Sequence, residues 1–201
     1  MFVSFEGLDG SGKTTQAKRL REWLEQEGGR VVATREPGGT PLGERVRDLL
    51  LDGDPIAPWS EAALFTAARA ELVDRVIGPA VNSGADVISD RYLDSSLAYQ
   101  GVARGLGVDR VLALNIHAIG GVLPDLTFLL LVDVEVARSR STAARDRMER
   151  EGDAFLELVD KGFRELASRF PQRIVSIEGD RPVEEVAEEI REHVRERAGA
   201  G

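Results

Sequence analysis

Cysteine is absent from the 201-residue sequence, and histidine occurs only twice. Without cysteine the chain has neither a disulfide framework nor a thiolate zinc site. Long hydrophobic runs are also lacking: FLLLV, residues 128–132, is among the longest and is far too short to span a bilayer. The opening residues, MFVSFEG, contain neither the basic nor the long apolar segment of a secretory signal. We therefore predict a cytoplasmic protein that has no membrane partner.

Positive charge is the minority sign, because 26 Lys and Arg stand against 35 Asp and Glu, for a net charge of -9. Such a balance argues against broad nucleic-acid binding, although basic residues can still cluster locally around phosphates. Small anions are therefore better candidate ligands than polymers. The length, with 42% hydrophobic and 30% charged residues, suits one domain over residues 1–201 with a sizeable core and room for a small mobile subdomain.

The first informative stretch is EGLDGSGKTT, residues 6–15, which contains the G-x-x-x-x-G-K-[ST] pattern of a phosphate-binding loop from Gly7 to Thr14. Its glycines let successive backbone N–H groups point into one concavity, where Lys13 adds a mobile cation and the Thr14 hydroxyl can ligate Mg²⁺. FVSF before the loop indicates a short strand, and KTTQAKRLREWLEQE after it indicates an amphipathic helix. An ordinary glycine-rich turn is the weaker interpretation.

Short apolar runs alternate with longer helical patterns along the rest of the chain. The strand candidates are residues 2–5, 31–34, 86–89, 126–132 and 173–177, and the helix candidates are residues 14–27, 42–51, 60–81, 109–119, 153–170 and 183–197. This alternation predicts an α/β fold with a five-stranded parallel sheet covered by helices on both faces. Ligands of such folds bind beyond the carboxyl ends of the strands, so the loops after Phe5, Thr34 and Ser89 should converge on one cleft.

Charged residues stand at two of these strand ends. Arg35 follows the second strand and precedes Pro37 and two glycines, which favour a tight backbone turn. Asp90 and Arg91 follow the third strand, where a carboxylate could lie near Mg²⁺ and a guanidinium could bind a phosphate through two bonds. Taken alone, Asp90 and Arg91 could equally be a structural ion pair. Their position beside a phosphate loop favours the functional interpretation.

Phe65 and Arg69 are four residues apart and therefore share one face of the helix predicted from residue 60. A ring beside a guanidinium could stack on a base and hydrogen-bond to its edge. From spacing alone, however, the simpler interpretation is favoured, in which Phe65 belongs to the core and Arg69 is a solvated neighbour.

The segment RSRSTAARDRMEREGD follows the fourth strand and has hardly any apolar residues. Its arginines are Arg138, Arg140, Arg145, Arg147 and Arg150. Such runs are most often solvated helices of mixed charge. The functional alternative is a lid at about residues 138–152 that closes over a triphosphate, excludes water and brings arginines to the transferring phosphoryl group.

Several motifs together, in this order, resemble the thymidylate kinases (dTMP kinases): EGLDGSGKTT, TREPGGT, LFTAARAEL, DRYLDSSLAYQG, GGVLPDLT and DRME. The resemblance covers nearly the whole chain. It implies the P-loop nucleoside monophosphate kinase fold with a short arginine-rich lid. It also implies a homodimer and, with Mg²⁺, the transfer of a phosphoryl group from ATP to dTMP, giving ADP and dTDP for dTTP synthesis.

The resemblance also implies site residues. It assigns the ATP phosphates to Gly7, Leu8, Asp9, Gly10, Ser11, Gly12, Lys13, Thr14 and Thr15, and Mg²⁺ to Thr14 and Asp90. It assigns dTMP to Asp9 at the 3′-hydroxyl, Arg35 and Arg91 at the phosphate, Phe65 and Arg69 at thymine, and Pro37, Ser96, Tyr99 and Gln100 along the pocket, with Tyr99 crowding the place of a ribose 2′-hydroxyl. Some family members have an arginine where this chain has Gly10, and others have a lid arginine instead. The chain is similar to the second kind, so Arg140, Arg145 and Arg147 are the lid candidates, beside Lys13 and Arg91, for catalysis.

The sequence departs from the family pattern at Leu131, where an aspartate is common, and at Phe163, where a tyrosine is common. Phe163 has helical spacing from Phe155, Val159 and Leu166, which predicts a core residue.

The nearest alternative function is that of another nucleotide or nucleoside kinase on the same scaffold. A nucleotide-binding module without turnover is less favoured, because the guanine-reading N-K-x-D pattern does not occur and the arginine-rich segment would have no purpose.

Overall fold

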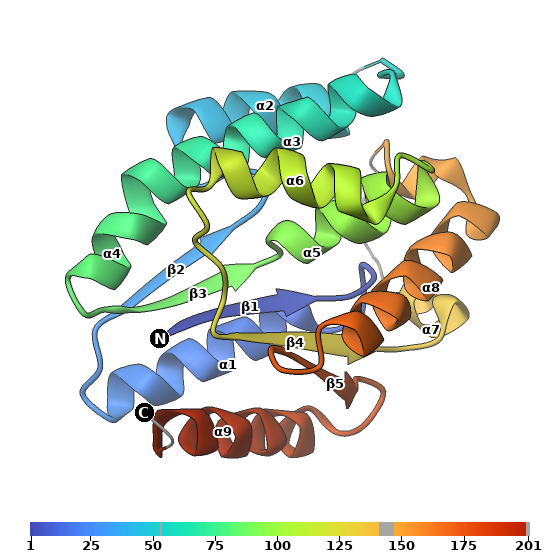
Figure 1. The fold of residues 1–201 in the computed structure, drawn as a ribbon. Helices are drawn as coiled ribbons and strands as arrows, with labels where there is room; N and C mark the ends of the chain where they lie inside the picture. The colour runs from blue at the N-terminus through green and yellow to red at the C-terminus, as the bar shows by residue number, and fades with distance from the viewer. Residues whose placement is uncertain (53, 141–146, 200–201) are drawn as a thin grey trace.

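Five short apolar strands form the centre of the computed structural model, and helices cover both faces of the sheet (Figure 1). The structure describes residues 1–52, 54–140 and 147–199. The strands are β1 (Phe2–Glu6), β2 (Val31–Arg35), β3 (Asp86–Asp90), β4 (Leu126–Leu131) and β5 (Ile174–Glu178). All pairings are parallel, in the order β2-β3-β1-β4-β5. The predicted α/β class and five-stranded parallel sheet are confirmed.

Burial on both sides explains why the strands are continuously hydrophobic. In β1, Val3 and Phe5 pack toward α1 (Lys13–Gln26) and α9 (Val183–Gly199), where they meet Leu20 of α1. Phe2 packs on the opposite side, in the larger core. Every residue of β1 is buried, as expected for a central parallel strand.

The larger core lies between the sheet and α3 (Pro58–Leu72), α4 (Gly78–Asn82), α5 (Leu93–Ser96), α6 (Val108–Ala118) and α8 (Asp153–Arg169), with the short α7 (Val134–Arg140) and the 3₁₀ turn η3 (Glu149–Glu151) leading to α8. Helix α2 (Pro41–Leu51) packs on α3 through a smaller cluster that contains Val46, Leu50 and Ala68. Phe163 of α8 is 2% exposed and packs edge-on against Tyr99, with ring centroids 6.2 Å apart. The predicted core position of Phe163 is confirmed.

The helix predicted over residues 60–81 is confirmed, but it is not α-helical throughout. The chain is α-helical to Leu72, widens into the π-helical stretch η1 (Val73–Ile77) and returns to α4. Pro79 lies in the first turn of α4 and has no backbone N–H, so it cannot donate to the carbonyl four residues before it. A wider turn accommodates that missing bond.

A second π-helical stretch, η2 (Leu97–Ala103), continues directly from α5 and was not predicted as helix at all. Its residues Leu97 to Gly101 are all buried, which removes the alternation of polar and apolar faces that identifies a surface helix. No helix in the described ranges is long and apolar enough to cross a membrane.

Candidate active site at the carboxyl ends of the strands

A cleft of about 860 Å³ opens where β1, β3 and β2 end. It is lined by residues 9–16 after β1, Arg35 and Glu36 after β2, Asp90 and Arg91 after β3, together with Arg47, Arg140, Gly179, Arg181, Val183 and Val186. The prediction that the loops after Phe5, Thr34 and Ser89 converge on one cleft is confirmed. Positive side chains dominate this lining, so the cleft suits anions.

The loop after β1 is held close to its neighbours by glycines with left-handed backbones. At Gly7, where φ is 134°, a Cβ atom would lie 2.5 Å from the Leu130 carbonyl oxygen of β4. At Gly10, where φ is 83°, it would lie 2.1 Å from the Ala137 carbonyl oxygen of α7. Only glycine fits these two positions, and the loop leads into α1 at Lys13. The loop therefore presents its backbone at the N-terminus of a helix, as a phosphate cradle requires.

Lys13 is curled over this loop with 5% of its surface exposed. Its Nζ donates to the Leu8 carbonyl at 2.7 Å and lies 3.5 Å from Asp9 Oδ1. Burial, and then the neighbouring Arg91, lower the pKa of the Lys13 ammonium from its ordinary value. An incoming phosphate would add negative charge beside this buried cation and favour its charged form.

Arg91 joins the end of β3 to the same loop. Its Nη2 donates to Asp9 Oδ1 at 2.6 Å, and its Nη1 donates to Ser95 Oγ at 2.9 Å. Burial acts to raise the pKa of the Asp9 carboxyl, but Arg91 and Lys13 outweigh it and hold that pKa well below its usual range. Asp9 is thus a carboxylate shared by two cations, one from the phosphate loop and one from the next strand.

Thr14 and Asp90 lie side by side at the edge of the cleft, where Thr14 Oγ1 donates to Asp90 Oδ2 at 2.5 Å. No group of three or more His, Cys, Asp or Glu side chains gathers as a metal site within residues 1–52, 54–140 and 147–199. One carboxylate and one hydroxyl nevertheless fit Mg²⁺, which keeps several waters and takes the rest of its ligands from substrate phosphates. The pair predicted from sequence is therefore brought together.

Arg35 reaches the cleft from β2, where its Nη2 donates to both carboxylate oxygens of Glu44 at 3.1 and 2.9 Å. The bond from Glu36 to Pro37 is cis, and the Pro37 carbonyl accepts from Arg47 Nη1 at 2.9 Å. Arg47 of α2 was missed in the sequence, although it ends the same stretch of residues that begins at Arg35. Its helical position, next to buried Val46 on α2, gave no sign that it faces the cleft.

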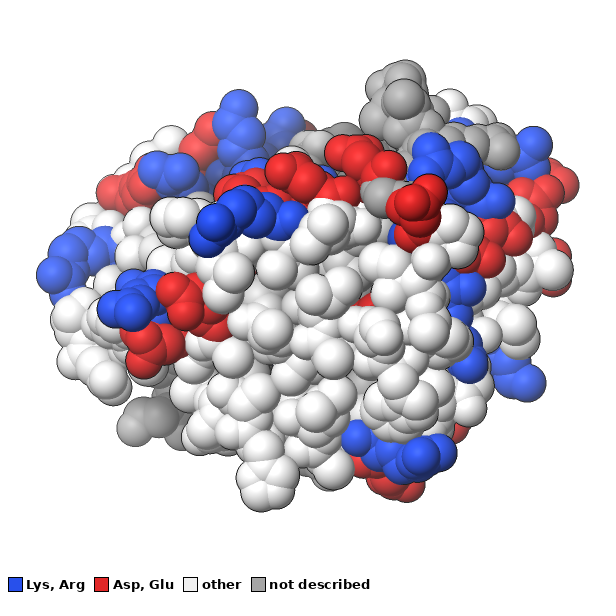
Figure 2. Space-filling model, turned by 90° about the horizontal axis from the view of Figure 1, so that it is seen from above, with Lys and Arg blue, Asp and Glu red and all other residues white. Residues whose placement is uncertain are grey.

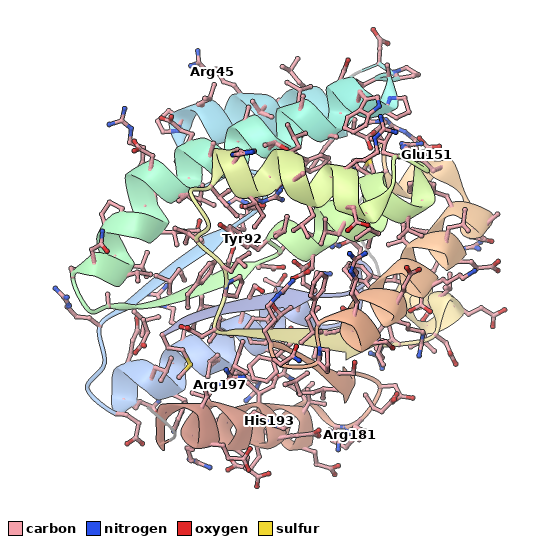
Figure 3. All side chains as sticks on the ribbon, in the orientation of Figure 1. Arg45, Tyr92, Glu151, Arg181, His193 and Arg197 are labelled. Carbon is pink, nitrogen blue, oxygen red and sulfur yellow. The ribbon has the colours of Figure 1, made fainter. Side chains whose placement is uncertain are left out.

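Arg181 was also missed. It lines the cleft from the loop between β5 and α9, and Figure 3 shows it at the beginning of α9. The rule that strand ends converge was applied only to the loops after the first three strands. Applied to β5, the same rule would have indicated Arg181.

Arg69 is 1% exposed and each of its three guanidinium nitrogens has a hydrogen-bond partner, so the sequence-based interpretation of a solvated neighbour was wrong. Its Nε donates to Glu36 Oε2 at 2.8 Å, its Nη2 donates to the Tyr92 carbonyl at 3.1 Å, and its Nη1 donates to Asn115 Oδ1. Figure 3 shows Tyr92 in the interior, between the sheet and α6. Phe65, one turn before Arg69, is half-buried against α2. The guanidinium is therefore fixed in one orientation before any ligand binds.

The pocket residues predicted after β3 lie on α5 and η2 and are all buried. Ser96 is 2%, Tyr99 7% and Gln100 1% exposed. The Arg91 guanidinium lies 5.5 Å from the centre of the Tyr99 ring, and Gln100 Nε2 donates to Glu61 Oε1 at 2.8 Å. These contacts place Tyr99 next to Arg91 and hold Gln100 against α3.

The arginines of the predicted lid are separated by the structure. Arg140 lines the cleft and its Nη1 donates to the Gly179 carbonyl at 3.1 Å. Arg147 is 6% exposed and is instead paired with Glu61, at 2.8 Å from Nη1 to Oε2, and with the Leu50 carbonyl. Arg145 lies outside the described residues. Of these three candidates, the structure brings Arg140 to the phosphate loop and places Arg147 beneath the end of α2.

The chain is similar to known proteins over nearly its whole length. The family model described as thymidylate kinase matches residues 5–190. The chain is 46% identical over 202 residues to a thymidylate kinase of Mesoplasma florum, covering 98% of this chain and 96% of that protein. It is 48% identical over 199 residues to one of Gloeobacter violaceus, covering 96% and 94%. A crystal structure of thymidylate kinase from Ehrlichia chaffeensis superposes with a TM-score of 0.81 and 36% identity, covering 96% of this chain and 98% of that one.

Proposed function

The chain belongs to the thymidylate kinase family, and from that premise we propose how its cleft transfers the γ-phosphoryl group of ATP to dTMP, giving ADP and dTDP. The observation that carries the assignment of roles is the position of Asp9, whose carboxylate lies 3.5 Å from Lys13 and 2.6 Å from Arg91. Lys13 of the phosphate loop and Arg91 after β3 thus lie on either side of the Asp9 carboxylate. Phosphoryl transfer needs a donor and an acceptor phosphate that are held close together and in line.

The donor end is the loop from Gly7 to Thr15. Its backbone N–H groups and Lys13 hold the ATP phosphates, and Arg181 borders the same cleft from the loop after β5. Thr14 and Asp90 would hold Mg²⁺. The ion would supply positive charge that neutralises the charge developing on the phosphate oxygens.

The acceptor end is formed by Arg35 and Arg91, which bind the phosphate of dTMP. The pair between Arg35 and Glu44 is about half exposed, so it is weak and can exchange for a phosphate. Asp9 accepts a hydrogen bond from the 3′-hydroxyl of the deoxyribose, and Pro37 borders the nucleotide. Since a nucleotide phosphate is already anionic at neutral pH, the reaction needs alignment and charge neutralisation rather than a strong general base.

The base end comprises Phe65, Arg69, Ser96, Tyr99 and Gln100. Phe65 stacks on thymine, and Arg69 donates to its edge from the orientation fixed by its three buried partners. A preorganised donor discriminates because a base without the matching acceptor leaves a buried charge unsatisfied. Tyr99 occupies the space that a ribose 2′-hydroxyl would need.

The experiment that tests this function is a coupled assay of ADP release with ATP and Mg²⁺. It compares dTMP, dUMP, dCMP, dGMP, thymidine and no acceptor. Turnover that is fastest with dTMP and lost on chelation of the metal supports both the acceptor and the ion. Faster turnover with thymidine would overturn the roles of Arg35 and Arg91, and ADP release that needs no acceptor would overturn the kinase.

We also expect Arg140 to be the lid arginine that acts on the transferring group. Arg140→Ala should lower kcat about 100-fold with little change in KM, because a charge that acts mainly in the transition state is removed.

Arg147→Ala should instead lower the melting temperature, since it breaks a buried pair with Glu61. Steady-state kinetics and thermal unfolding separate the two effects.

The matched control for these variants is Arg138→Ala, which removes an arginine of the same helix whose partner, Asp153, is exposed. Its kcat should stay within about twofold of the wild type, because exposed ion pairs contribute little. An Arg140→Ala enzyme with wild-type kcat would contradict the lid assignment.

The active form is proposed to be a homodimer in the cytoplasm, with residues 1–201 as one kinase domain and the lid at about 138–152. Figure 2 shows a broad area without charged side chains on the side of the molecule that carries α3 and α6. Exposed Ala63 and Ala67 of α3 and Ala113 of α6 belong to these two helices. An uncharged surface with small side chains suits contact with a second copy. Light scattering on the purified protein measures the mass.

A further inference from the structure

A buried carboxyl group with no role so far lies directly beneath the acceptor arginine. Glu6 is the last residue of β1 and is 0% exposed. Its Oε1 accepts the Tyr92 backbone N–H at 2.8 Å, and its Oε2 accepts the Ser95 hydroxyl at 2.5 Å. Burying a carboxyl group at the end of a central strand costs free energy. The two hydrogen bonds to Tyr92 and Ser95 therefore indicate that Glu6 does more than fill space in the core.

Both partners of Glu6 are joined to Arg91, Tyr92 through the peptide bond and Ser95 through a hydrogen bond. Arg91 has a φ of 68°, which is uncommon for a residue other than glycine, and its backbone N–H donates to the Phe5 carbonyl at 2.9 Å. Tyr92 is the next residue, and Ser95 Oγ accepts from Arg91 Nη1 at 2.9 Å. An unfavourable backbone conformation persists only where the surroundings hold it. Glu6 supplies that hold on the backbone through Tyr92 and on the guanidinium through Ser95.

We propose that Glu6 is a positioning residue for the acceptor site. As a carboxylate it accepts from Tyr92 and Ser95 together, and this fixes the turn at Arg91 and the direction of its guanidinium toward the phosphate of dTMP. This inference rests on the proposed function of Arg91. It does not require that Glu6 touch either nucleotide.

Charged groups from four elements face Glu6: Lys13 of α1, Arg91 after β3, Asp94 of α5 and Arg173 before β5. Arg173 is itself paired with Asp94 through two bonds at 2.6 and 2.7 Å. Burial, and then the negative charge of Asp94, raise the pKa of Glu6 to about 7, against the opposing effects of Arg91, Ser95 and Tyr92. Glu6 therefore changes its protonation state near neutral pH.

The direction in which efficiency with dTMP changes with pH follows from the hydrogen bonds of Glu6. Above the pKa, Glu6 is ionised and both oxygens accept, so Arg91 is held. Below it, one oxygen carries a proton and no longer accepts from its partner in the same way. Efficiency with dTMP should therefore rise with pH through the neutral range.

The test is the pH profile of kcat/KM for dTMP, from about pH 5.5 to 9, for the wild type and Glu6→Gln. The ratio of wild-type to variant kcat/KM should rise near pH 7, because glutamine mimics the protonated acid at every pH. The two should agree at the acid end and differ about tenfold at the alkaline end, with KM for ATP unchanged. Ionisation of the dTMP phosphate, with a pKa of about 6, occurs in both and cancels in their ratio.

Two further variants complete the test. Asp94→Asn removes the like charge and should move the rise to lower pH, and it decides the question if Glu6→Gln does not fold. Glu25→Gln makes the same chemical change on the exposed face of α1 and should keep the wild-type profile. A purely structural role would lower the melting temperature of Glu6→Gln and reduce kcat/KM equally at every pH.

A constant ratio of the two profiles would therefore overturn the inference, and so would a rise that Asp94→Asn leaves in place. Failure of the proposed function is distinguishable, because the wild type would then show no turnover that depends on dTMP at any pH.

Discussion

Lys13→Ala should lower kcat for dTMP phosphorylation about 1,000-fold, the largest loss we expect from a single substitution. The ammonium lies over the phosphate loop, donates to the Leu8 carbonyl at 2.7 Å and is 5% exposed, so it is a buried and preorganised charge. Removing one such donor from a transition state costs about 10²–10³ in kcat, and Lys13 also neutralises the ground-state phosphates. The measurement is steady-state ADP release with saturating dTMP.

The control for Lys13 is Lys18→Ala on the same helix, where the side chain is exposed and paired with Glu22. That variant should retain full turnover. If Lys13→Ala keeps more than about a tenth of the wild-type kcat while its fold is intact, the phosphate loop does not have the role assigned to it.

Arg91→Ala should reduce kcat/KM for dTMP about 1,000-fold and leave the affinity for ATP within about twofold. The substitution removes a phosphate contact, the link to Ser95 and the partner of Asp9 at once, and buried charge pairs cost most when one member is lost. Titration with ATP, followed by titration with dTMP, separates the donor end from the acceptor end.

The control here is Arg45→Ala, since Figure 3 shows Arg45 on the outer side of α2, away from the sheet. The Arg45→Ala variant loses the same charge at a residue that does not line the cleft. An equal loss of ATP and dTMP affinity in Arg91→Ala would show that the residue supports the whole cleft rather than the acceptor.

The parts of the fold that could be predicted are those fixed by local pattern. Each strand candidate matched a strand to within a residue or two, because a strand buried on both faces appears as a short continuous apolar run. The phosphate loop was visible because its glycines serve backbone geometry, which a sequence spells out directly. The π-helical stretch η1 was not visible, because one proline alters the hydrogen bonds of residues before it.

The partners of buried charges could not be predicted, since they come from distant parts of the chain. Arg69 is separated by 46 residues from Asn115, and Glu6 by 89 residues from Ser95. The spacing of Phe65 and Arg69 placed both on one helical face without showing whether that face was buried or exposed to solvent. Arg147 looked like the other lid arginines because nothing near it in sequence indicates Glu61. Burial decides these roles, and burial is a property of the assembled fold.

The contact between Gly10 and the carbonyl of Ala137 limits how this enzyme can be re-engineered or can diverge. An arginine moved from the lid into the phosphate loop would have to start from a Cβ atom 2.1 Å from the backbone of α7. That helix, which precedes the segment proposed as a lid, would first have to shift, since a backbone atom cannot move aside as a flexible side chain does. The two ways of supplying a catalytic arginine are therefore not one substitution apart in this chain, and a viable intermediate would have to change loop and helix together.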